Sequence, residues 1–295
     1  MYIYLNGEFV DQKHATISVF DRGLLYGDGV FETMRAYKGN ILWLSQHLDR
    51  LFNSAHIIML PIKKPKQAFA EILKQMVVRN ALDNGLLRVT VSRGEGSPGL
   101  DISTCQSPTI IITARHDTPY TATQYKQGVS LVTLDIQRNS VNALPPSIKS
   151  LNFLNNILAK IESTQKGAFD GIMLNQHGHL TEATTSNIFL TKNGTLFTPA
   201  TSCGILEGIT RNTVLSLAKE EQIISYQKAL TIDSLYEADE CFLTNTSMEL
   251  MPVLTVDGRM IGDSCPGPMT ERLHKAFRRR MARYLDELQT DKAEI

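Results

Sequence analysis

Alternating and periodic apolar positions divide the chain into short strands and a few amphipathic helices. The opening residues MYIYLNGEFV alternate apolar and polar side chains around an Asn-Gly pair, which predicts a β-hairpin. Apolar residues at helical spacing predict helices over residues 44–59 and 66–82. Alternation predicts strands at residues 86–93 and 108–115. Strands and helices are therefore mixed in the first part of the chain.

The second part of the chain predicts more strand than helix. Residues 129–135 are typical of a strand, and the segment SIKSLNFLNNILAKI predicts a helix that continues to about residue 165. Two hairpins follow, with turns at NQHG and TKNG. Further predictions are helices at 208–221 and 267–288 and strands at 238–246 and 252–258. The class is α+β with much antiparallel sheet, because regular βαβ alternation is missing.

The length of the chain favours two domains. A chain of 295 residues exceeds the usual size of a single hydrophobic core. The stretch HDTPYTATQYKQG has little apolar periodicity, which is typical of a connection between domains. We therefore expect a small α/β domain at residues 1–118, a linker at 119–131 and a larger domain at 132–295.

Composition argues against several classes of partner. The 30 basic and 30 acidic residues cancel, so neither nucleic acid nor an anionic membrane is expected as the main partner. The four cysteines are scattered without a CxxC pair, which predicts neither a metal site nor a disulfide framework. The N-terminal residues do not resemble a signal peptide, and no window has the apolar length of a membrane span. These patterns predict a soluble, cytoplasmic protein.

Lys149 and Glu182 each allow two interpretations. Lys149 begins an apolar segment, where its amine either reaches water along its aliphatic stem or is held inside with a lowered pKa and serves as a nucleophile. Glu182 lies among small hydroxylated residues in a predicted hairpin strand. It is either solvated or an interior acceptor for a protonated ring nitrogen. Taken alone, each residue fits the surface interpretation better.

Other candidates suit the binding of anions. Ile209 and Thr210 open a predicted helix, so Thr210 is either an ordinary N-cap or part of a phosphate seat. Arg50, on a predicted helix, and Arg35 and Arg88, in strand-like surroundings, suit bidentate recognition of phosphate or carboxylate unless they lie at the surface. Together an amine, an acid, a phosphate seat and spare arginines match the needs of pyridoxal 5′-phosphate.

The order of these segments along the chain and their amino-acid sequences resemble those of the class IV, or fold type IV, pyridoxal-phosphate enzymes. The resemblance runs over nearly the whole chain and is carried by FDRGLLYGDGVFETMRAY, HLDRL, IKSLNFLNNILAK, LTEATTSNIF, GILEGITR and TNTSMELMPV. It implies a small N-terminal α/β domain and a larger domain of pseudo-barrel type, with the cofactor in the cleft between them. It also implies a homodimer whose active site borrows residues from the partner.

The resemblance assigns roles to particular residues. Lys149 would bond covalently to the cofactor aldehyde and act as general base and acid, and Glu182 would bond the ring nitrogen. The remaining cofactor residues would be Arg50, Ile209, Thr210 and Thr246 at the phosphate and Leu206 against the ring. The substrate residues would be Tyr26, Phe31, Arg35, Arg88, Thr185 and Ser247.

Among the members of this family, the chain most resembles the branched-chain aminotransferases. VDGRMIGD, PGPMT and Arg88 support that choice, and they imply transfer of an amino group between a branched-chain L-amino acid and 2-oxoglutarate. Leu86, Phe153 and Thr33 depart from the branched-chain pattern. FETMR is frequent among 4-amino-4-deoxychorismate lyases, which come second, and D-amino acid aminotransferases come third. A carrier that binds the cofactor without turnover is the alternative from another class.

Overall fold

The computed structural model of the chain describes residues 1–117 and 120–293. Contacts group the chain into two compact units. Unit 1 comprises Met1–Thr118, Ile148–Asn152 and Arg283–Ile295, and unit 2 comprises Pro119–Ser147 and Phe153–Ala282. The domain ranges expected from the sequence stay a prediction. The grouping differs from them in that the short segment around Lys149 and the last residues of the chain join unit 1.

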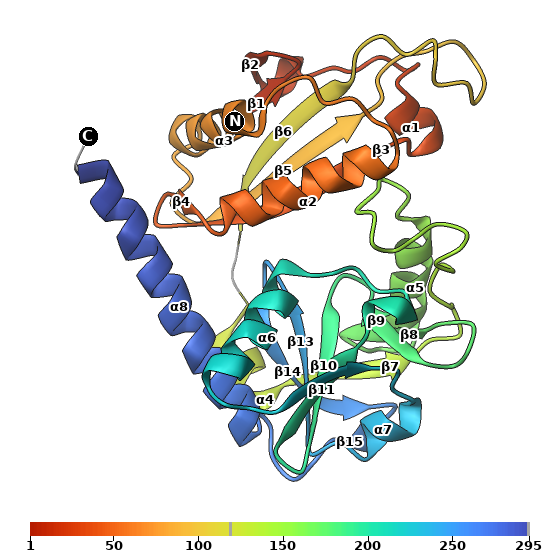
Figure 1. Ribbon diagram of the computed structural model, residues 1–295, viewed down its shortest axis with the longest axis vertical. Coiled ribbons are helices and arrows are strands. Elements are labelled where there is room, and N and C mark those ends of the chain that lie inside the picture. The colour runs from red at the N-terminus through yellow and green to blue at the C-terminus, as the bar shows by residue number, and fades with distance from the viewer. Residues whose placement is uncertain (118–119, 294–295) are drawn as a thin grey trace. The chain divides into compact units, whose positions relative to one another are not determined.

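Unit 1 contains an antiparallel sheet with the strand order β2-β1-β6-β5-β3-β4 (Figure 1). The strands are β1 (Tyr2–Leu5), β2 (Glu8–Asp11), β3 (Gly29–Tyr37), β4 (Asn40–Ile41), β5 (Gly85–Ser92) and β6 (Thr109–His116). The helices are the 3-10 turn η1 (Gln12–His14), α1 (Arg22–Tyr26), α2 (Leu44–Ile57) and α3 (Lys66–Arg79). The predicted N-terminal hairpin, the two helices and the two following strands are confirmed within a few residues.

The core of unit 1 lies between this sheet and helices α2 and α3. Val30 and Met34 alternate along β3 and are fully buried, as strand periodicity requires for the face that meets a core. Leu51 of α2 and Phe69 and Leu73 of α3 are equally buried against them. Each such side chain contributes about 1.5–3 kcal/mol of transfer free energy. This packing holds β3 firmly, and β3 carries several of the candidate residues.

The helix predicted from residue 147 begins later than expected. Helix α5 spans Leu154–Gln165, whereas Ile148–Asn152 run extended along the start of β3. The Phe31 N–H donates to the Lys149 carbonyl at 3.0 Å, and the Leu151 N–H donates to the Gly29 carbonyl at 2.9 Å. The backbone groups around Lys149 therefore have partners on β3, so this part of the segment gains nothing by becoming helical.

Unit 2 is built on a nine-stranded sheet with the order β12-β11-β10-β13-β14-β7-β8-β9, in which β15 pairs with β14. The strands are β7 (Val129–Thr133), β8 (Asp170–Leu174), β9 (Leu180–Ala183), β10 (Asn187–Lys192), β11 (Thr195–Pro199), β12 (Ser225–Lys228), β13 (Glu240–Asn245), β14 (Glu249–Val256) and β15 (Arg259–Met260). Strand β9 also lies beside β10 and β11, so the sheet curls on itself. Both predicted hairpins, β8-β9 and β10-β11, are confirmed.

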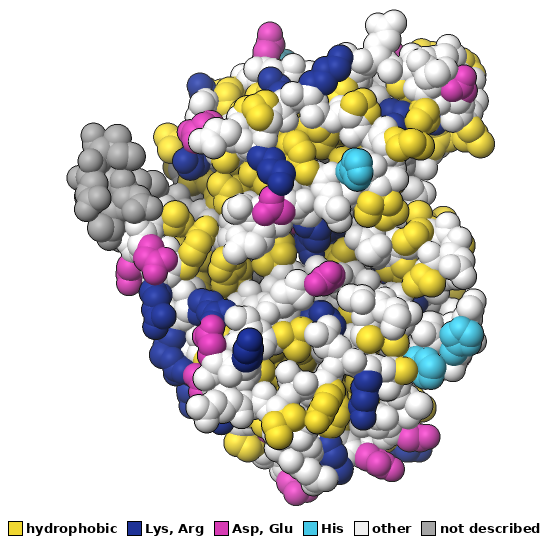
Figure 2. Space-filling view, in the orientation of Figure 1, with side chains coloured by type: hydrophobic (Ala, Val, Ile, Leu, Met, Phe, Trp, Pro, Cys, Tyr) yellow, Lys and Arg dark blue, Asp and Glu magenta, His cyan; other side chains and the backbone are white. Residues whose placement is uncertain are grey.

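Five helices and a 3-10 turn complete the part of unit 2 that the structure describes, with the last helix extending into unit 1. They are α4 (Ala122–Gln127), α5, η2 (Thr201–Cys203), α6 (Ile209–Glu220), α7 (Ile232–Tyr236) and α8 (Pro268–Ala293). Helix α4 lies within the range expected as a linker. Lys and Arg side chains gather along α8 (Figure 2), where Arg272 and Arg279 pair with Glu221. This basic face is thus balanced by acidic neighbours.

Two general findings concern the residues that the structure describes. None of their helices combines the length and the apolar composition that a membrane span requires. Their His, Cys, Asp and Glu side chains form no group of three or more that is placed to hold a metal ion.

Candidate active site

Lys149 and Arg88 meet at one aromatic ring in unit 1. The Lys149 Nζ lies 4.6 Å from the centroid of the Phe31 ring, and the Arg88 guanidinium carbon lies 3.7 Å from the same centroid. Phe31 is 4% exposed. The Lys149 backbone N–H donates to the Ser54 hydroxyl at 3.3 Å, which adds to the bond from Phe31 described above. An amine and a guanidinium are therefore both held against the ring of Phe31, which lies on β3.

The register of the sheet explains why the candidates on β3 and β5 share one face. Phe31, Thr33 and Arg35 lie opposite Thr90, Arg88 and Leu86, respectively, and side chains opposite each other in a sheet point to the same side. Two residues that depart from the branched-chain pattern, Thr33 and Leu86, thus lie directly beside Arg88 and Arg35. Arg35 is 2% exposed and donates to the Asp117 carboxylate at 3.1 Å.

Arg50, expected at the cofactor phosphate, is anchored by a buried carboxylate. Its Nε donates to Glu32 Oε1 at 2.6 Å and its Nη2 to Oε2 at 2.9 Å, while His47 Nδ1 lies 2.8 Å from Oε2. Burial alone raises the pKa of the Glu32 carboxyl, but Arg50 and His47 lower that pKa to about 2. Because an ionised carboxylate only accepts hydrogen bonds, the proton between Glu32 and His47 belongs to Nδ1.

Sequence reasoning missed the role of Glu32. Strand alternation offered a usable pattern, because Glu32 lies between Val30 and Met34 on the face that packs into the core. A carboxylate at such a position needs a cationic partner. Arg50 and His47, three residues apart on one face of a helix, are the partners. Arg50 is therefore positioned by β3 as well as by its own helix.

Glu182 lies in unit 2 and is not solvated. It is 5% exposed and pairs with Arg138, whose Nε and Nη2 lie 3.0 and 2.9 Å from Oε1. Its Oε2 accepts from the Asn187 amide at 3.1 Å and from the Leu206 backbone N–H at 3.0 Å. Sequence reasoning missed Arg138, since nothing local links it to an acid 44 residues away. This carboxylate is thus an interior acceptor that four donors hold in place.

The pairing of Arg138 with Glu182 makes a testable contribution to stability. Arg138→Lys keeps the positive charge but loses the forked geometry of the guanidinium, so we expect the free energy of unfolding to fall by about 1–2 kcal/mol. Urea denaturation measures this change. Arg279→Lys, which alters an exposed pair with Glu221, is the matched control and should cost less than about 0.5 kcal/mol. Equal losses in both variants would contradict the proposed importance of the buried pair.

The start of helix α6 offers hydrogen-bond donors. Gly208 is its N-cap, and no side chain caps the helix, so the first N–H groups, including those of Ile209 and Thr210, have no partner within the helix. Thr210 is therefore not the N-cap. Its hydroxyl is buried and, among the residues that the structure describes, has no hydrogen-bond partner. A Cβ at Gly208 would lie 2.1 Å from Asn187 Oδ1, so this position needs glycine.

The remaining candidates of unit 2 lie around the turn after β13. The Asn245 side-chain oxygen accepts from the Ser247 backbone N–H at 2.9 Å and from its hydroxyl at 3.0 Å, and the Asn245 amide donates to the Thr185 carbonyl at 3.3 Å. Thr246 is the residue between them in this turn. Thr185 and Asn245 also line a cavity of about 340 Å³. Asp170 is buried in its wall, and burial raises the pKa of its carboxyl.

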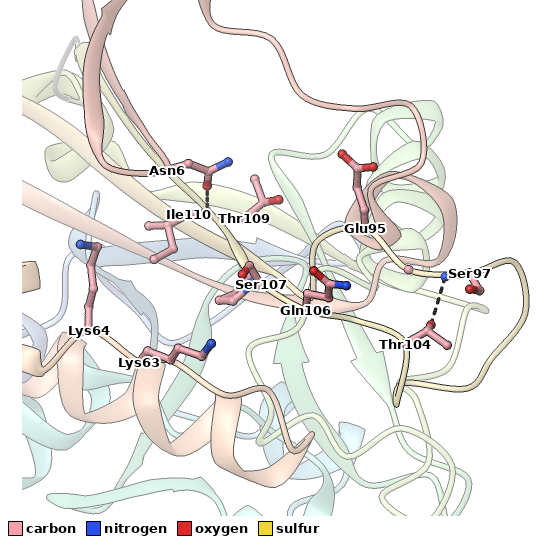
Figure 3. Close-up of a pocket in the computed structure, with 12 residues that line it drawn as sticks. Asn6, Lys63, Lys64, Glu95, Ser97, Thr104, Gln106, Ser107, Thr109 and Ile110 are labelled. Atoms are coloured by element: carbon pink, nitrogen blue, oxygen red, sulfur yellow. Dashed lines mark hydrogen bonds between the residues drawn. The ribbon is translucent and has the colours of Figure 1, made fainter.

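A second cavity, in unit 1, involves none of the predicted site residues. This groove of about 870 Å³ is lined by Lys63, Lys64 and residues of the segments 95–97 and 104–110 (Figure 3). Part of its polar lining is already satisfied, because Asn6 accepts from the Ile110 N–H at 2.8 Å and Thr104 from the Ser97 N–H at 3.0 Å. The groove is therefore a largely polar surface beside the loop that joins β5 to β6.

Comparison with known proteins places this arrangement in one family. Residues 29–256 match the family model described as amino-transferase class IV. The chain belongs to this family and is an aminotransferase. It is 42% identical over 278 residues to the Methanocaldococcus jannaschii protein named "Putative branched-chain-amino-acid aminotransferase", covering 94% of this chain and 96% of that protein. It is 34% identical over 291 residues to a D-alanine aminotransferase of Listeria monocytogenes, covering 98% and 99% of the two chains.

Solved structures share the fold as well. The branched-chain aminotransferase of Thermoproteus uzoniensis, solved with norvaline, superimposes with a TM-score of 0.89 at 32% identity, covering 95% of this chain and 94% of that chain. Another branched-chain amino acid aminotransferase of this fold was solved with pyridoxamine 5′-phosphate. The expected α+β class and the fold of the type IV aminotransferases are therefore confirmed.

Proposed function

We propose that the protein transfers the amino group of a branched-chain L-amino acid to 2-oxoglutarate with bound pyridoxal 5′-phosphate. The observation that carries this proposal is the meeting of Lys149 and Arg88 at Phe31. An amine suits covalent attachment and proton transfer, and a guanidinium suits the substrate carboxylate. The names of the relatives supply the substrate class, and the apolar Leu86 and Phe31 beside Arg88 and Arg35 agree with it.

The residues present fit pyridoxal phosphate. In unit 2 the phosphate suits the uncapped N–H groups of Ile209 and Thr210, the Thr210 hydroxyl, which has no partner among the described residues, and Thr246. Arg50 of unit 1 is the arginine that the resemblance assigns to the phosphate. The ring nitrogen suits Glu182, with Leu206 against the ring. Each Glu182 oxygen already accepts two hydrogen bonds. Asn187 is the donor that can yield, because its amide also bonds the Leu206 carbonyl at 2.8 Å.

When bound, the cofactor supplies an aldehyde for the amine and a protonated ring that withdraws electrons from the substrate. Lys149 Nζ takes the proton from the substrate Cα as a base and returns a proton as an acid. Arg88 and Arg35 favour the carboxylate end of the substrate. The Phe31 ring contacts the amine on one side, with its centroid 4.6 Å from Nζ. Arg138 keeps the charge of Glu182 fixed in one orientation, so that a protonated ring nitrogen meets an ionised acceptor.

We also propose that the protein works as a cytoplasmic homodimer. Apolar side chains of both units are exposed in a single copy of the chain: Val19, Phe20, Leu24, Leu25, Leu154, Ile157, Leu158 and Ile161. Exposed apolar side chains at several positions of one helix, as at Leu154, Ile157, Leu158 and Ile161 on α5, are typical of a protein interface. A second copy of this chain is the partner expected from the resemblance to dimeric relatives.

A substrate screen tests the proposed reaction. The purified protein with pyridoxal phosphate should convert L-leucine and 2-oxoglutarate to glutamate, with a specific activity at least about tenfold above that with D-alanine. Coupled detection of glutamate measures the rate. Pyruvate released from 4-amino-4-deoxychorismate would assign the lyase reaction instead, and a preference for D-alanine would assign the D-specific transaminase. Bound cofactor without turnover of any substrate would leave only a carrier.

A further inference from the structure

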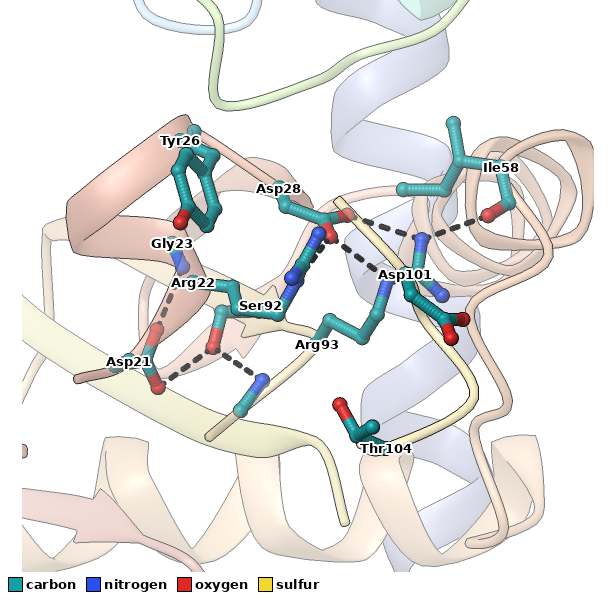
Figure 4. A network of polar contacts seen from close by, with 12 residues as sticks. Asp21, Arg22, Gly23, Tyr26, Asp28, Ile58, Ser92, Arg93, Asp101 and Thr104 are labelled. Carbon is teal, nitrogen blue, oxygen red and sulfur yellow. Dashed lines mark hydrogen bonds and ion pairs between the residues drawn. The ribbon is translucent and has the colours of Figure 1, made fainter. Parts of the chain in front are cut away.

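A partly buried carboxylate, that of Asp28, joins two arginines where helix α1 leads into the sheet of unit 1 (Figure 4). Asp28 Oδ2 accepts from Arg22 Nε at 2.9 Å and from Arg93 Nε at 2.8 Å, and Oδ1 accepts from Arg93 Nη2 at 2.9 Å. Arg22 is 3% exposed and Arg93 is 6% exposed. Burial on its own raises the pKa of the Asp28 carboxyl, but bonds from Arg93 and Arg22 hold that pKa below its ordinary value.

The two arginines reach from Asp28 in different directions. Arg93 donates to the carbonyls of Ile58 and Met59, at 2.8 and 2.9 Å, just after helix α2. Arg22 donates from Nη1 to the Gly99 carbonyl at 2.7 Å, in the loop between β5 and β6. Arg93 therefore links Asp28 to the backbone after helix α2, and Arg22 links Asp28 to the loop between β5 and β6.

The side chains of the loop that Arg22 contacts form hydrogen bonds mainly with one another. Side-chain bonds within it are local, joining Ser97 to Thr104 and Ser103 to Asp101, and Leu100 at its tip is 79% exposed. The tip is therefore not anchored by burial of this side chain. The conformation of the loop therefore depends on the contacts of its backbone with α1.

Tyr26 takes part in the same contacts. The Arg22 guanidinium carbon lies 4.9 Å from the centroid of the Tyr26 ring, and the Gly99 N–H donates to the Tyr26 hydroxyl at 3.4 Å. Gly99 thus meets α1 twice, through its carbonyl at Arg22 and through its N–H at Tyr26. Its φ of +108° favours glycine at this point.

We propose that Arg22 is a positioning residue that fixes the loop 96–104 against Tyr26 and thereby sets how tightly the amino-acid substrate binds, without touching the substrate. The inference rests on the proposed function, because the substrate role of Tyr26 belongs to it. Asp28 holds Arg22 in the orientation that this task needs. The ion pair with Asp28 gives the Arg22 guanidinium a fixed direction that a lysine ammonium does not reproduce.

The experiment compares two variants that share Asp28. Arg22→Lys should increase hydrogen exchange of the peptide covering residues 96–104 about tenfold and raise KM for L-leucine by a similar factor, with kcat changed less than about threefold. Arg93→Lys is the matched control. It alters the bonds of Arg93 to Asp28 and to the Ile58 and Met59 carbonyls and should lower stability. Because Arg22 keeps its own bonds to Asp28 and Gly99, loop exchange and KM should both stay within about twofold.

The outcomes separate this inference from the proposed function. Unchanged loop exchange in Arg22→Lys overturns the inference, and so does faster exchange with an unchanged KM. If the unmodified protein turns over no amino acid, the proposed function fails, and the effect on substrate binding fails with it, while the exchange data still decide whether Arg22 fixes the loop. Should Arg22→Lys not fold, Tyr26→Phe should raise exchange of the same peptide about threefold, and no increase there overturns the inference.

Discussion

Lys149→Ala is expected to lower the rate of transamination by about 10⁴-fold, because the variant loses the amine that attaches the cofactor and moves the Cα proton. The visible absorbance of covalently held cofactor should disappear. Cofactor retained through phosphate contacts should dissociate on dialysis faster than from the unmodified protein.

Single-turnover kinetics with L-leucine and absorbance spectra measure both effects. Lys74→Ala is the matched control, since Lys74 is exposed on α3 and pairs with Glu71 on the same helix. It should leave rate and spectrum unchanged. A Lys149→Ala protein that still attaches the cofactor covalently would assign the attachment to another lysine and remove the centre of the proposed mechanism.

Glu32→Gln should destabilise the protein by about 3–5 kcal/mol at pH 7, because it leaves the guanidinium of Arg50 beside a neutral amide in a buried site. Glu32 is fully buried and bonds both Arg50 and His47. Chemical denaturation measures the loss. Glu71→Gln changes an exposed pair on α3 and should cost less than about 0.5 kcal/mol.

The effect of Glu32→Gln should depend on pH in a defined direction. The pKa of Glu32 is lowered to about 2 in the folded protein from an ordinary value of 4.5. The stabilisation by the carboxylate is therefore fully present above about pH 4.5 and is lost as the pH falls through about 2. The difference between the two proteins should be constant near neutrality and should narrow below about pH 4.5. A gap that widens in acid would contradict the assigned charge of Glu32.

Much of the fold was predictable because periodicity reports local burial. The helices α2 and α3 and the hairpins of unit 2 follow apolar spacing and turn residues, which act within a few positions. The prediction of a helix at Lys149 was wrong because the decisive partners are backbone groups of β3, more than 100 residues away. Such pairing leaves no pattern in the segment itself. Ser150 and Asn152, poor helix formers, were the available indication.

The sequence proposes the candidate residues by type and order, but it does not name their hydrogen-bond and ion-pair partners. Glu182 became a candidate through the resemblance to the family, whereas Arg138 lies in an irregular segment with no motif around it. Arg22 and Asp28 belong to a motif that the sequence shows, but their link to Arg93 appears only in three dimensions. Charged pairs join elements that the folded chain brings together, so a linear pattern names single residues more readily than the bonds between them.

The extended segment at Lys149 has a consequence for the order in which the protein is made. Strand β3 has β5 and β4 as sheet partners, but the N–H of Phe31 finds its acceptor on Lys149, which leaves the ribosome more than 100 residues later. The first part of the chain therefore cannot form the hydrogen bond from Phe31 to Lys149 during early synthesis. The Phe31 ring that contacts the Lys149 amine therefore lacks this partner until the first segment of unit 2, Pro119–Ser147, and then Lys149 itself have been synthesised, so the amine site cannot assemble before about half of the chain has been made.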